Sequence, residues 1–105
     1  MRALTLCDMV GYQQGAVVSK EIIKSDSATI TLFAFDKGQS LSEHTAPFEV
    51  MVNVIDGTAE ITVSGHSCIV NRGQMIIIPC DCPHSLKAKE PFKMLLIMAR
   101  SRAGK

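Results

Sequence analysis

The sequence predicts an all-β domain, and three observations support that fold class. Segments of strand length follow one another along the chain with Gly, Asp, Asn and Ser between them, which is typical of a sandwich or barrel. No stretch repeats apolar residues at helical spacing over about ten positions or more, so helix should be limited to one turn near 4–10. The length of 105 residues suits one domain with one site.

Turn-forming residues separate the predicted strands. The expected strands span residues 16–23, 29–36, 50–55, 59–63, 67–70, 74–79, 84–88 and 92–99. Asp56-Gly57 and Ser64-Gly65 suit tight hairpins, and the segment 71–73 ends in a glycine that suits a three-residue connection. These turns predict an antiparallel meander across 50–79.

The chain is expected to form a single domain over residues 1–105. Its barrel core should cover about 15–99, preceded by an N-terminal segment at 1–14 and followed by a basic tail at 100–105. We expect no internal repeat, linker or second unit.

Composition limits the classes of partner. The 11 Lys and Arg residues nearly balance the 10 Asp and Glu residues, so charge gives no reason to expect a nucleic acid or a membrane surface as partner. The first residues lack the apolar region of a signal peptide, and no run approaches the roughly 20 apolar residues of a membrane span. Four irregularly spaced cysteines do not form a disulfide framework. The expected location is therefore the cytoplasm.

Strand alternation assigns side chains to faces. Successive side chains of a strand point to opposite sides, so His84 and Leu86 should share the interior face of their strand. Val50 and Val52 form a clean apolar face of another strand, whereas Glu49 has the opposite parity. We expect Glu49 to point away from the interior.

The spacing of several residues resembles the cupin family, which consists of small double-stranded β-helix barrels with jelly-roll topology. The first cupin motif reads G-x5-H-x-H-x3-E-x6-G, and the second reads G-x5-P-x-G-x2-H-x3-N. The residues that match at the correct spacing are Gly38, His44, Gly57, Gly73, Pro79 and His84. The resemblance covers nearly the whole chain and implies an RmlC-like cupin barrel.

The departures from these motifs concern the metal site. The resemblance implies that three His and one Glu hold an ion in metal-binding cupins. Here Ala46 and Val50 occupy two of those four positions, while Asp81 and Ala88 replace the Gly and Asn of the second motif. The sequence therefore predicts a cupin barrel with a degenerate metal site.

The first functional hypothesis is an uncharacterised cupin barrel that binds a small, partly apolar molecule without a tightly held metal. Imidazole both donates and accepts hydrogen bonds, so two histidines could orient a ligand between apolar walls. The expected pocket residues are His44, His84, Ala46, Val50, Val52 and Leu86.

The alternative is a metal-dependent cupin enzyme of the dioxygenase or isomerase type. It would use His44, His84 and a non-standard third ligand to hold iron, nickel, manganese or zinc. Glu49 is the nearest carboxylate, and it could turn inward if Pro47 and Phe48 formed a bulge. A metal-free epimerase would instead need a histidine base and an opposing acid. The sequence leaves open whether the protein is an enzyme.

The strand expected at 29–36 is apolar on both faces. Phe33 and Phe35 share one side, and Leu32 and Ala34 share the other. A strand buried on both sides in so small a barrel suggests that a second subunit covers it. Together with the resemblance to small cupins, this pattern predicts a homodimer.

Overall fold

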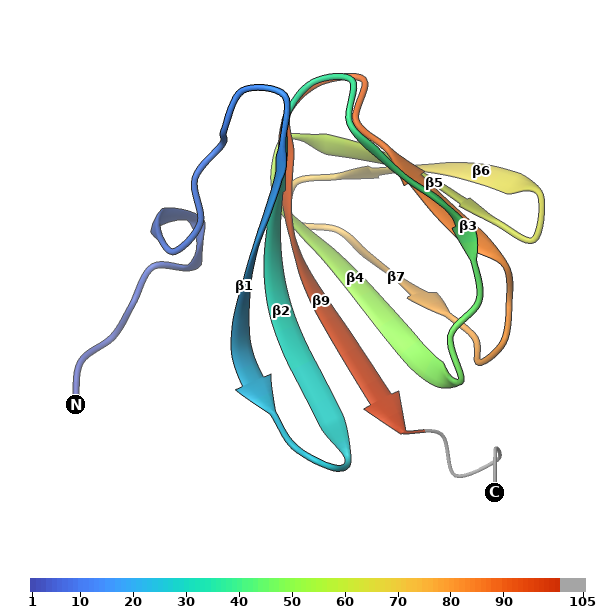
Figure 1. The fold of residues 1–105 in the computed structure, drawn as a ribbon, viewed down its shortest axis with the longest axis horizontal. Helices are drawn as coiled ribbons and strands as arrows, with labels where there is room; N and C mark the ends of the chain where they lie inside the picture. The colour runs from blue at the N-terminus through green and yellow to red at the C-terminus, as the bar shows by residue number, and fades with distance from the viewer. Residues whose placement is uncertain (101–105) are drawn as a thin grey trace.

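The computed structural model describes residues 1–100, which form nine β-strands and one short 3-10 helix (Figure 1). The elements are η1 (Leu6–Asp8), β1 (Val17–Lys24), β2 (Ala28–Phe35), β3 (Ser40–His44), β4 (Phe48–Asp56), β5 (Thr58–Val63), β6 (His66–Asn71), β7 (Met75–Ile78), β8 (His84–Lys87) and β9 (Phe92–Arg100). Within this range no helix has the length and apolar character needed to cross a bilayer. Arg100, expected in the tail, ends β9, and 101–105 lie outside the described residues.

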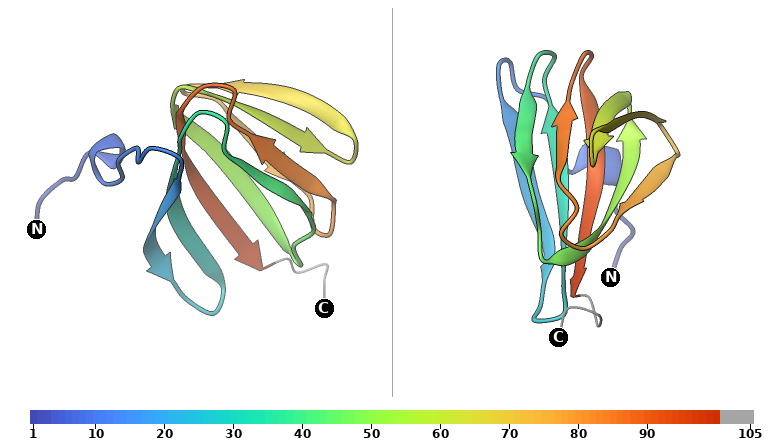
Figure 2. Two further views of the ribbon diagram at one scale, coloured as in Figure 1. Left: turned by 45° about the horizontal axis from the view of Figure 1, so that its top comes forward. Right: turned by 90° about the vertical axis from the view of Figure 1, so that its right-hand side faces the viewer.

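The strands form two antiparallel sheets that face each other. One sheet has the order β1-β2-β9-β4-β7, and the other has the order β3-β8-β5-β6. The strands converge along one side of the molecule and fan apart toward the other (Figure 1), and the turned views show the two layers (Figure 2). This architecture confirms the all-β, double-stranded β-helix expectation.

The meander expected across 50–79 is wrong at two of its three turns. β5 and β6 form a hairpin through Ser64 and Gly65, which have φ values of 49° and 83°. However, β4 pairs with β7 and β9, while β5 pairs with β6 and β8. The chain therefore crosses between sheets at Gly57 and again before β7. Turn chemistry alone cannot distinguish a hairpin from a crossing, because both need a sharp reversal with positive φ.

Strand β3 was missed in the sequence because its residues carry little hydrophobic pattern. Its burial alternates weakly, and Leu41 is its side chain that packs against the barrel core. β3 is an edge strand that pairs with β8 alone, with an irregularity between Leu41 and His44. Edge strands need few apolar residues, since one side and much of one face remain in water.

The main core fills the space between the two sheets. Its largest aromatic contact joins Phe35 and Phe92, whose rings stack with centroids 4.6 Å apart at 10°. The buried members of this core are Phe35, Val50, Val52, Val54, Ala59, Ile61, Val70, Ile78, Leu86, Ala88, Phe92 and Met94. They come from both sheets, so each sheet covers the inner face of the other.

The N-terminal segment covers part of the outer face of the larger sheet. Val10 packs there with Leu32 and Ala34 of β2 in a second buried cluster. Phe33 and Phe35 face the main core, which confirms that β2 is apolar on both sides. The chain's own N-terminal segment covers the outer side of β2 around Leu32 and Ala34, so burial of both faces of this strand does not by itself require a second subunit.

Tyr12 fixes this N-terminal segment to the sheet. Its hydroxyl donates a 2.6 Å hydrogen bond to Oδ2 of Asp56, and Nζ of Lys93 lies 5.0 Å from the ring centroid. Lys93 Nζ also donates to the carbonyl oxygen of Cys7. Partial burial, and then the hydrogen bond to Asp56 and its negative charge, raise the pKa of Tyr12 well above its usual value.

This raised pKa predicts a loss of stability at alkaline pH. Because the folded-state pKa lies above that of the unfolded chain, the contribution of Tyr12 is fully present below the ordinary pKa of 10.0 and is lost as pH rises beyond it. Thermal unfolding followed between about pH 9 and pH 11 should show a steeper decline for the native protein than for Tyr12→Phe. Parallel declines would contradict this role for Tyr12.

Candidate functional site

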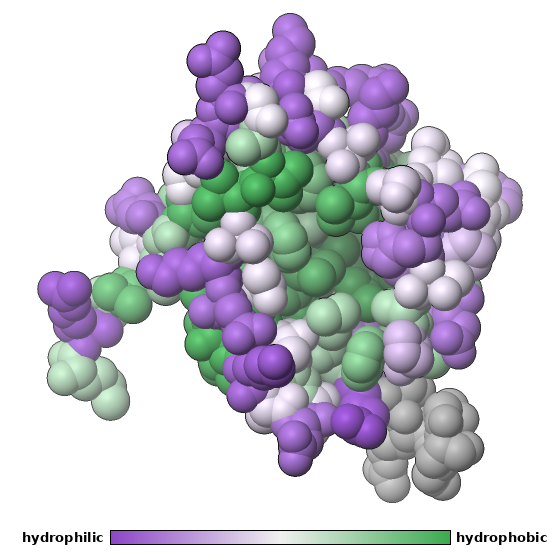
Figure 3. Space-filling view, in the orientation of Figure 1, coloured by the Kyte–Doolittle hydropathy of each residue, from purple (hydrophilic) through white to green (hydrophobic). Residues whose placement is uncertain are grey.

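A cavity of about 50 Å³ lies between the two sheets at the residues that the sequence singled out. All six expected pocket residues line it: His44, Ala46, Val50, Val52, His84 and Leu86. Figure 3 shows hydrophobic side chains gathered in the middle of this face of the molecule, with hydrophilic residues around them. The geometry therefore brings the predicted set together around one space.

Five further residues line the same cavity and were not expected there. They are Leu41, Ile78, Met94, Leu96 and Met98. Three of them belong to β9, which is apolar on both faces, so alternation gave no signal for which side faces inward. The cavity wall is thus almost entirely apolar, and the two imidazoles are its polar groups.

His44 and His84 lie side by side on neighbouring strands. They are direct partners in the pairing of β3 with β8, and their ring centroids are 4.3 Å apart with an interplanar angle of 60°. His84 is 5% exposed, as expected for an interior residue, whereas His44 is exposed. The His84 imidazole therefore belongs to the buried wall of the cavity, and the His44 imidazole lies where the cavity opens to solvent.

Backbone carbonyl groups fix the orientation of both rings. Nδ1 of His44 lies 2.8 Å from the carbonyl oxygen of Ser42, and Nδ1 of His84 lies 2.9 Å from that of Cys82. A carbonyl oxygen accepts hydrogen bonds, so these contacts assign the proton to Nδ1 in each ring. Each neutral imidazole is then left with Nε2 as an acceptor. Within residues 1–100 the structure gives neither Nε2 a hydrogen-bond partner.

The donor set does not fit a tightly held ion of the kind that the cupin motifs imply. A histidine that ligates a metal usually donates its other ring N–H to a carbonyl or carboxylate oxygen, and the contacts of Nδ1 in these two rings resemble that arrangement. However, Ala46 and Val50 provide no ligand atom, and residues 1–100 contain no cluster of three His, Cys, Asp or Glu side chains able to hold a metal. Catalytic zinc sites ordinarily use three protein ligands.

Glu49 cannot complete this set in the geometry observed. The pairing of β4 with β9 is regular from Phe48 to Val54, so no bulge turns Glu49 inward. Glu49 is exposed and lines a separate pocket on the outer face of the sheet, beside Met51 and Ile77. Strand parity therefore holds at this position, and the carboxylate lies on the wrong side of β4.

The other candidate side chains lie outside the cavity. His66 is exposed, and its Nδ1 is 3.1 Å from the carbonyl oxygen of Ser64. Cys82 packs against the main core, and Cys80 donates a 3.3 Å hydrogen bond to the carboxylate of Asp81, which raises the pKa of the thiol. Asp81, at the glycine position of the second motif, has a φ of 64° and so retains the backbone shape of a glycine.

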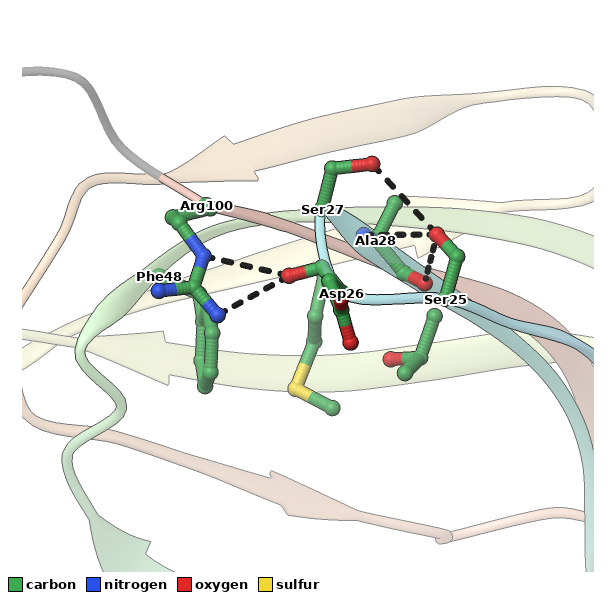
Figure 4. A pocket seen from close by; sticks show the side chains of 8 residues that line it. Ser25, Asp26, Ser27, Ala28, Phe48 and Arg100 are labelled. Atoms are coloured by element: carbon green, nitrogen blue, oxygen red, sulfur yellow. Dashed lines mark hydrogen bonds between the residues drawn. The ribbon is translucent and has the colours of Figure 1, made fainter.

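A second, more polar pocket adjoins the turn between β1 and β2 (Figure 4). Its volume is about 210 Å³. It is lined by Ser25, Asp26, Ser27, Ala28, Thr29, Phe48, Met98 and Arg100. It could not be predicted from the sequence, because Arg100 was expected in the basic tail and short polar turn residues give no signal of a pocket.

Arg100 holds this turn in place. Its Nε and Nη2 donate to the carbonyl oxygen of Asp26 at 3.1 and 2.9 Å, as the dashed lines in Figure 4 show. Its backbone N–H also donates to the carbonyl oxygen of Ser27. A guanidinium carries five N–H donors, so this arrangement leaves others available.

Two opposed antiparallel sheets around a cavity with paired histidines define a cupin-type barrel. The chain belongs to the cupin family, since the model of the Cupin domain matches residues 31–98. Among curated proteins, none matches the chain.

Solved structures of similar proteins agree with this assignment. A conserved protein of unknown function from Streptococcus pyogenes is 35% identical, with a TM-score of 0.92 over 96% of this chain and 89% of that one. A cupin superfamily protein from Desulfitobacterium hafniense is 27% identical, with a TM-score of 0.91 over 95% and 92% of the two chains.

A cupin 2 conserved barrel domain protein from Leptotrichia buccalis is similar over part of its length. The two are 37% identical, with a TM-score of 0.89 over 91% of this chain and 47% of that one. This chain thus corresponds to about half of that protein.

Proposed function

We propose that the protein binds a small, partly apolar molecule in the barrel cavity, between His44 and His84, without a tightly held metal ion. The observation that carries this proposal is the pair of adjacent imidazoles in an otherwise apolar wall. Ligand sites are typically apolar, with a few polar groups that fix orientation. The two Nε2 atoms are such groups, because backbone contacts already hold both rings.

Histidine resonances provide a direct test of binding. Small aliphatic alcohols and acids, added during NMR of the imidazole side chains, should shift the signals of His44 and His84. His66 provides an internal reference, because it is exposed and does not line the cavity. His44→Ala should weaken binding roughly tenfold through the loss of one hydrogen bond. Equal shifts at all three histidines would count against a cavity site.

Metal content separates this proposal from the alternative enzyme. Protein purified without added metal should carry far less than one equivalent of iron, nickel, manganese or zinc by elemental analysis, because two imidazoles are too few ligands. Near-stoichiometric metal that is lost in His44→Ala and His84→Ala would instead favour a metal-dependent enzyme of the dioxygenase or isomerase type. The orientation of the two rings is the observation that favours this second candidate.

We further propose that the chain forms a homodimer. Part of the outer face of the larger sheet remains apolar beyond the N-terminal segment, where Met51, Ile77, Ile97 and Ala99 surround a shallow pocket. Ile77 is 58% exposed, an unfavourable state for a large aliphatic side chain unless another surface covers it. Light scattering at micromolar concentration should give a dimer mass that Ile77→Glu reduces. A monomer mass for the native protein would refute the proposal.

A cytoplasmic location is also part of this proposal. All four cysteines are free, and none is paired within the described residues. Free thiols persist in reducing compartments, whereas secreted domains of this size commonly use disulfides. Cell fractionation would test this location.

A further inference from the structure

The size of the barrel cavity limits what it can hold. Its volume of about 50 Å³ has room for a few water molecules or a small chemical group. Sites for larger ligands typically measure roughly 300–1,000 Å³. A molecule of more than a few atoms that reaches the two histidines must therefore extend out of this cavity.

The polar pocket beside the β1–β2 turn adjoins the inner cavity at Met98, so the two together form a longer path than the cavity alone. Met98 lines both spaces, and in the sheet it lies between Thr29 of β2 and Val50 of β4. Directly paired residues point to the same face, so these three side chains form one continuous row. Arg100 follows Met98 by two positions on β9 and has the same parity. The outer pocket is thus an extension of the inner cavity across one side chain.

The two ends of this path have different polar chemistry. At the inner end, Nδ1 of His44 and of His84 is held by a backbone carbonyl, so the neutral form of each ring presents Nε2 as an acceptor that suits a hydroxyl donor. At the outer end, Arg100 offers guanidinium donors, and no ion pair to an acidic side chain is recorded for it within residues 1–100. Arginine suits a carboxylate, because its charge strengthens each hydrogen bond.

Thr29 adds a second sign that the outer pocket is incomplete without a ligand. Its Oγ1 is the one buried side-chain N or O atom recorded without a hydrogen-bond partner in the described part of the chain. A buried hydroxyl in that state is unfavourable, because it has lost its hydrogen bonds to water without gaining others. Asp26 opposes an anion, since its carboxylate lines the same pocket. Removal of this negative charge in Asp26→Asn should therefore affect the binding of an anion in the opposite direction to removal of the positive charge of Arg100.

We infer that the ligand is an aliphatic hydroxy acid, with its hydroxyl at the two histidines, its apolar carbons across Met98 and its carboxylate at Arg100. This inference rests on the proposed function and names its ligand class. Met98 and Arg100 are separated by about 7 Å along the strand, which is the outer part of the path, so the ligand must be longer than this and compounds of different chain length measure the full span. The reverse orientation would put a carboxylate against two acceptors.

A matched set of compounds tests each end separately. The probe is 6-hydroxyhexanoate; hexanoate lacks its hydroxyl, and hexane-1,6-diol lacks its carboxylate. Affinities are measured by NMR titration, with the histidine signals as a marker of entry into the cavity. 4-Hydroxybutanoate and 8-hydroxyoctanoate vary the length of the chain.

The variants are Arg100→Gln, Asp26→Asn and, as a control, Arg72→Gln, whose side chain lines neither pocket. We expect Arg100→Gln to weaken 6-hydroxyhexanoate about tenfold, to the level of the diol, with no effect on the diol itself. Asp26→Asn should strengthen the acid, and Arg72→Gln should change nothing. Added salt should weaken the acid but not the diol.

The outcomes distinguish the two proposals. If the hydroxy acids shift both cavity histidines but Arg100→Gln leaves the preference for acid over diol unchanged, the hydroxy-acid inference fails and the proposed binding function stands. If none of the acids or alcohols shifts His44 or His84, the proposed function fails, and the inference fails with it.

Discussion

Gly57→Ala should lower the free energy of unfolding by roughly 2–5 kcal/mol. A Cβ at this position would lie 2.3 Å from the carbonyl oxygen of Pro91 and 3.0 Å from Cα of Phe92, both of which are backbone atoms. Gly57 also has a φ of 73°, which L-residues other than glycine rarely adopt. Urea denaturation monitored by circular dichroism measures this loss.

Gly65→Ala is the matched control for Gly57→Ala. Gly65 has a φ of 83°, but its missing Cβ would meet no atom within 4 Å. This variant therefore has the conformational cost without the steric one, roughly 1–2 kcal/mol. Equal losses in the two variants would mean that the loop around Pro91 moves aside, and that the close approach of Gly57 to Pro91 and Phe92 is not a constraint on the fold.

The contrast between these two glycines also explains which turns the sequence could predict. Asp56-Gly57 and Ser64-Gly65 look alike in sequence, and both need positive φ. Ser64-Gly65 closes the hairpin of β5 and β6, whereas Asp56-Gly57 passes the chain from one sheet to the other. The difference lies in the close packing of Gly57 on Pro91, which is a contact between residues far apart in the chain.

Parity predicted the wall of the site because the strands concerned have one apolar and one mixed face. Val50 and Val52 contrast with Glu49, and His84 alternates with a serine, so each strand has one clear inner side. β9 has no such contrast, and the contributions of Met94, Leu96 and Met98 therefore followed from the structure alone. The outer polar pocket was hidden for a different reason, since it joins a turn to the last described residue of the chain.

The two ligand positions lost from the cupin motifs have a structural consequence beyond the absence of donors. Val50 belongs to the buried core and is 3% exposed, and Ala46 packs against the same core. Apolar side chains therefore occupy space in which a metal-binding relative would place polar ligands. The small volume of the cavity and its apolar wall have this common cause, and they support the proposal of a ligand that presents one small polar group to the histidines.

Phe92→Ala should be the most damaging single truncation in the main core, at about 3–5 kcal/mol. Phe92 is fully buried and stacks on Phe35 with a centroid distance of 4.6 Å. The loss is a large fraction of the roughly 5–15 kcal/mol that stabilises a typical domain. A loss of this size can leave Phe92→Ala largely unfolded, so the milder variant Phe92→Leu is measured beside it. Phe92→Leu should lower the free energy of unfolding in urea by no more than about 1.5–3 kcal/mol.

Phe33→Ala is the control for Phe92→Ala. Phe33 is half-buried, and its ring meets Phe35 at 6.1 Å and 39°, so its truncation exposes an existing surface more than it opens a closed void. It should cost clearly less than Phe92→Ala, and the double variant Phe35→Leu, Phe92→Leu should show a coupling of about 0.5–1.5 kcal/mol. Equal losses for Phe33→Ala and Phe92→Ala, with no coupling, would mean that the core next to Gly57 relaxes around the missing ring. In that case the close packing of Gly57 against Pro91 and the start of β9 would not constrain the core around Phe92.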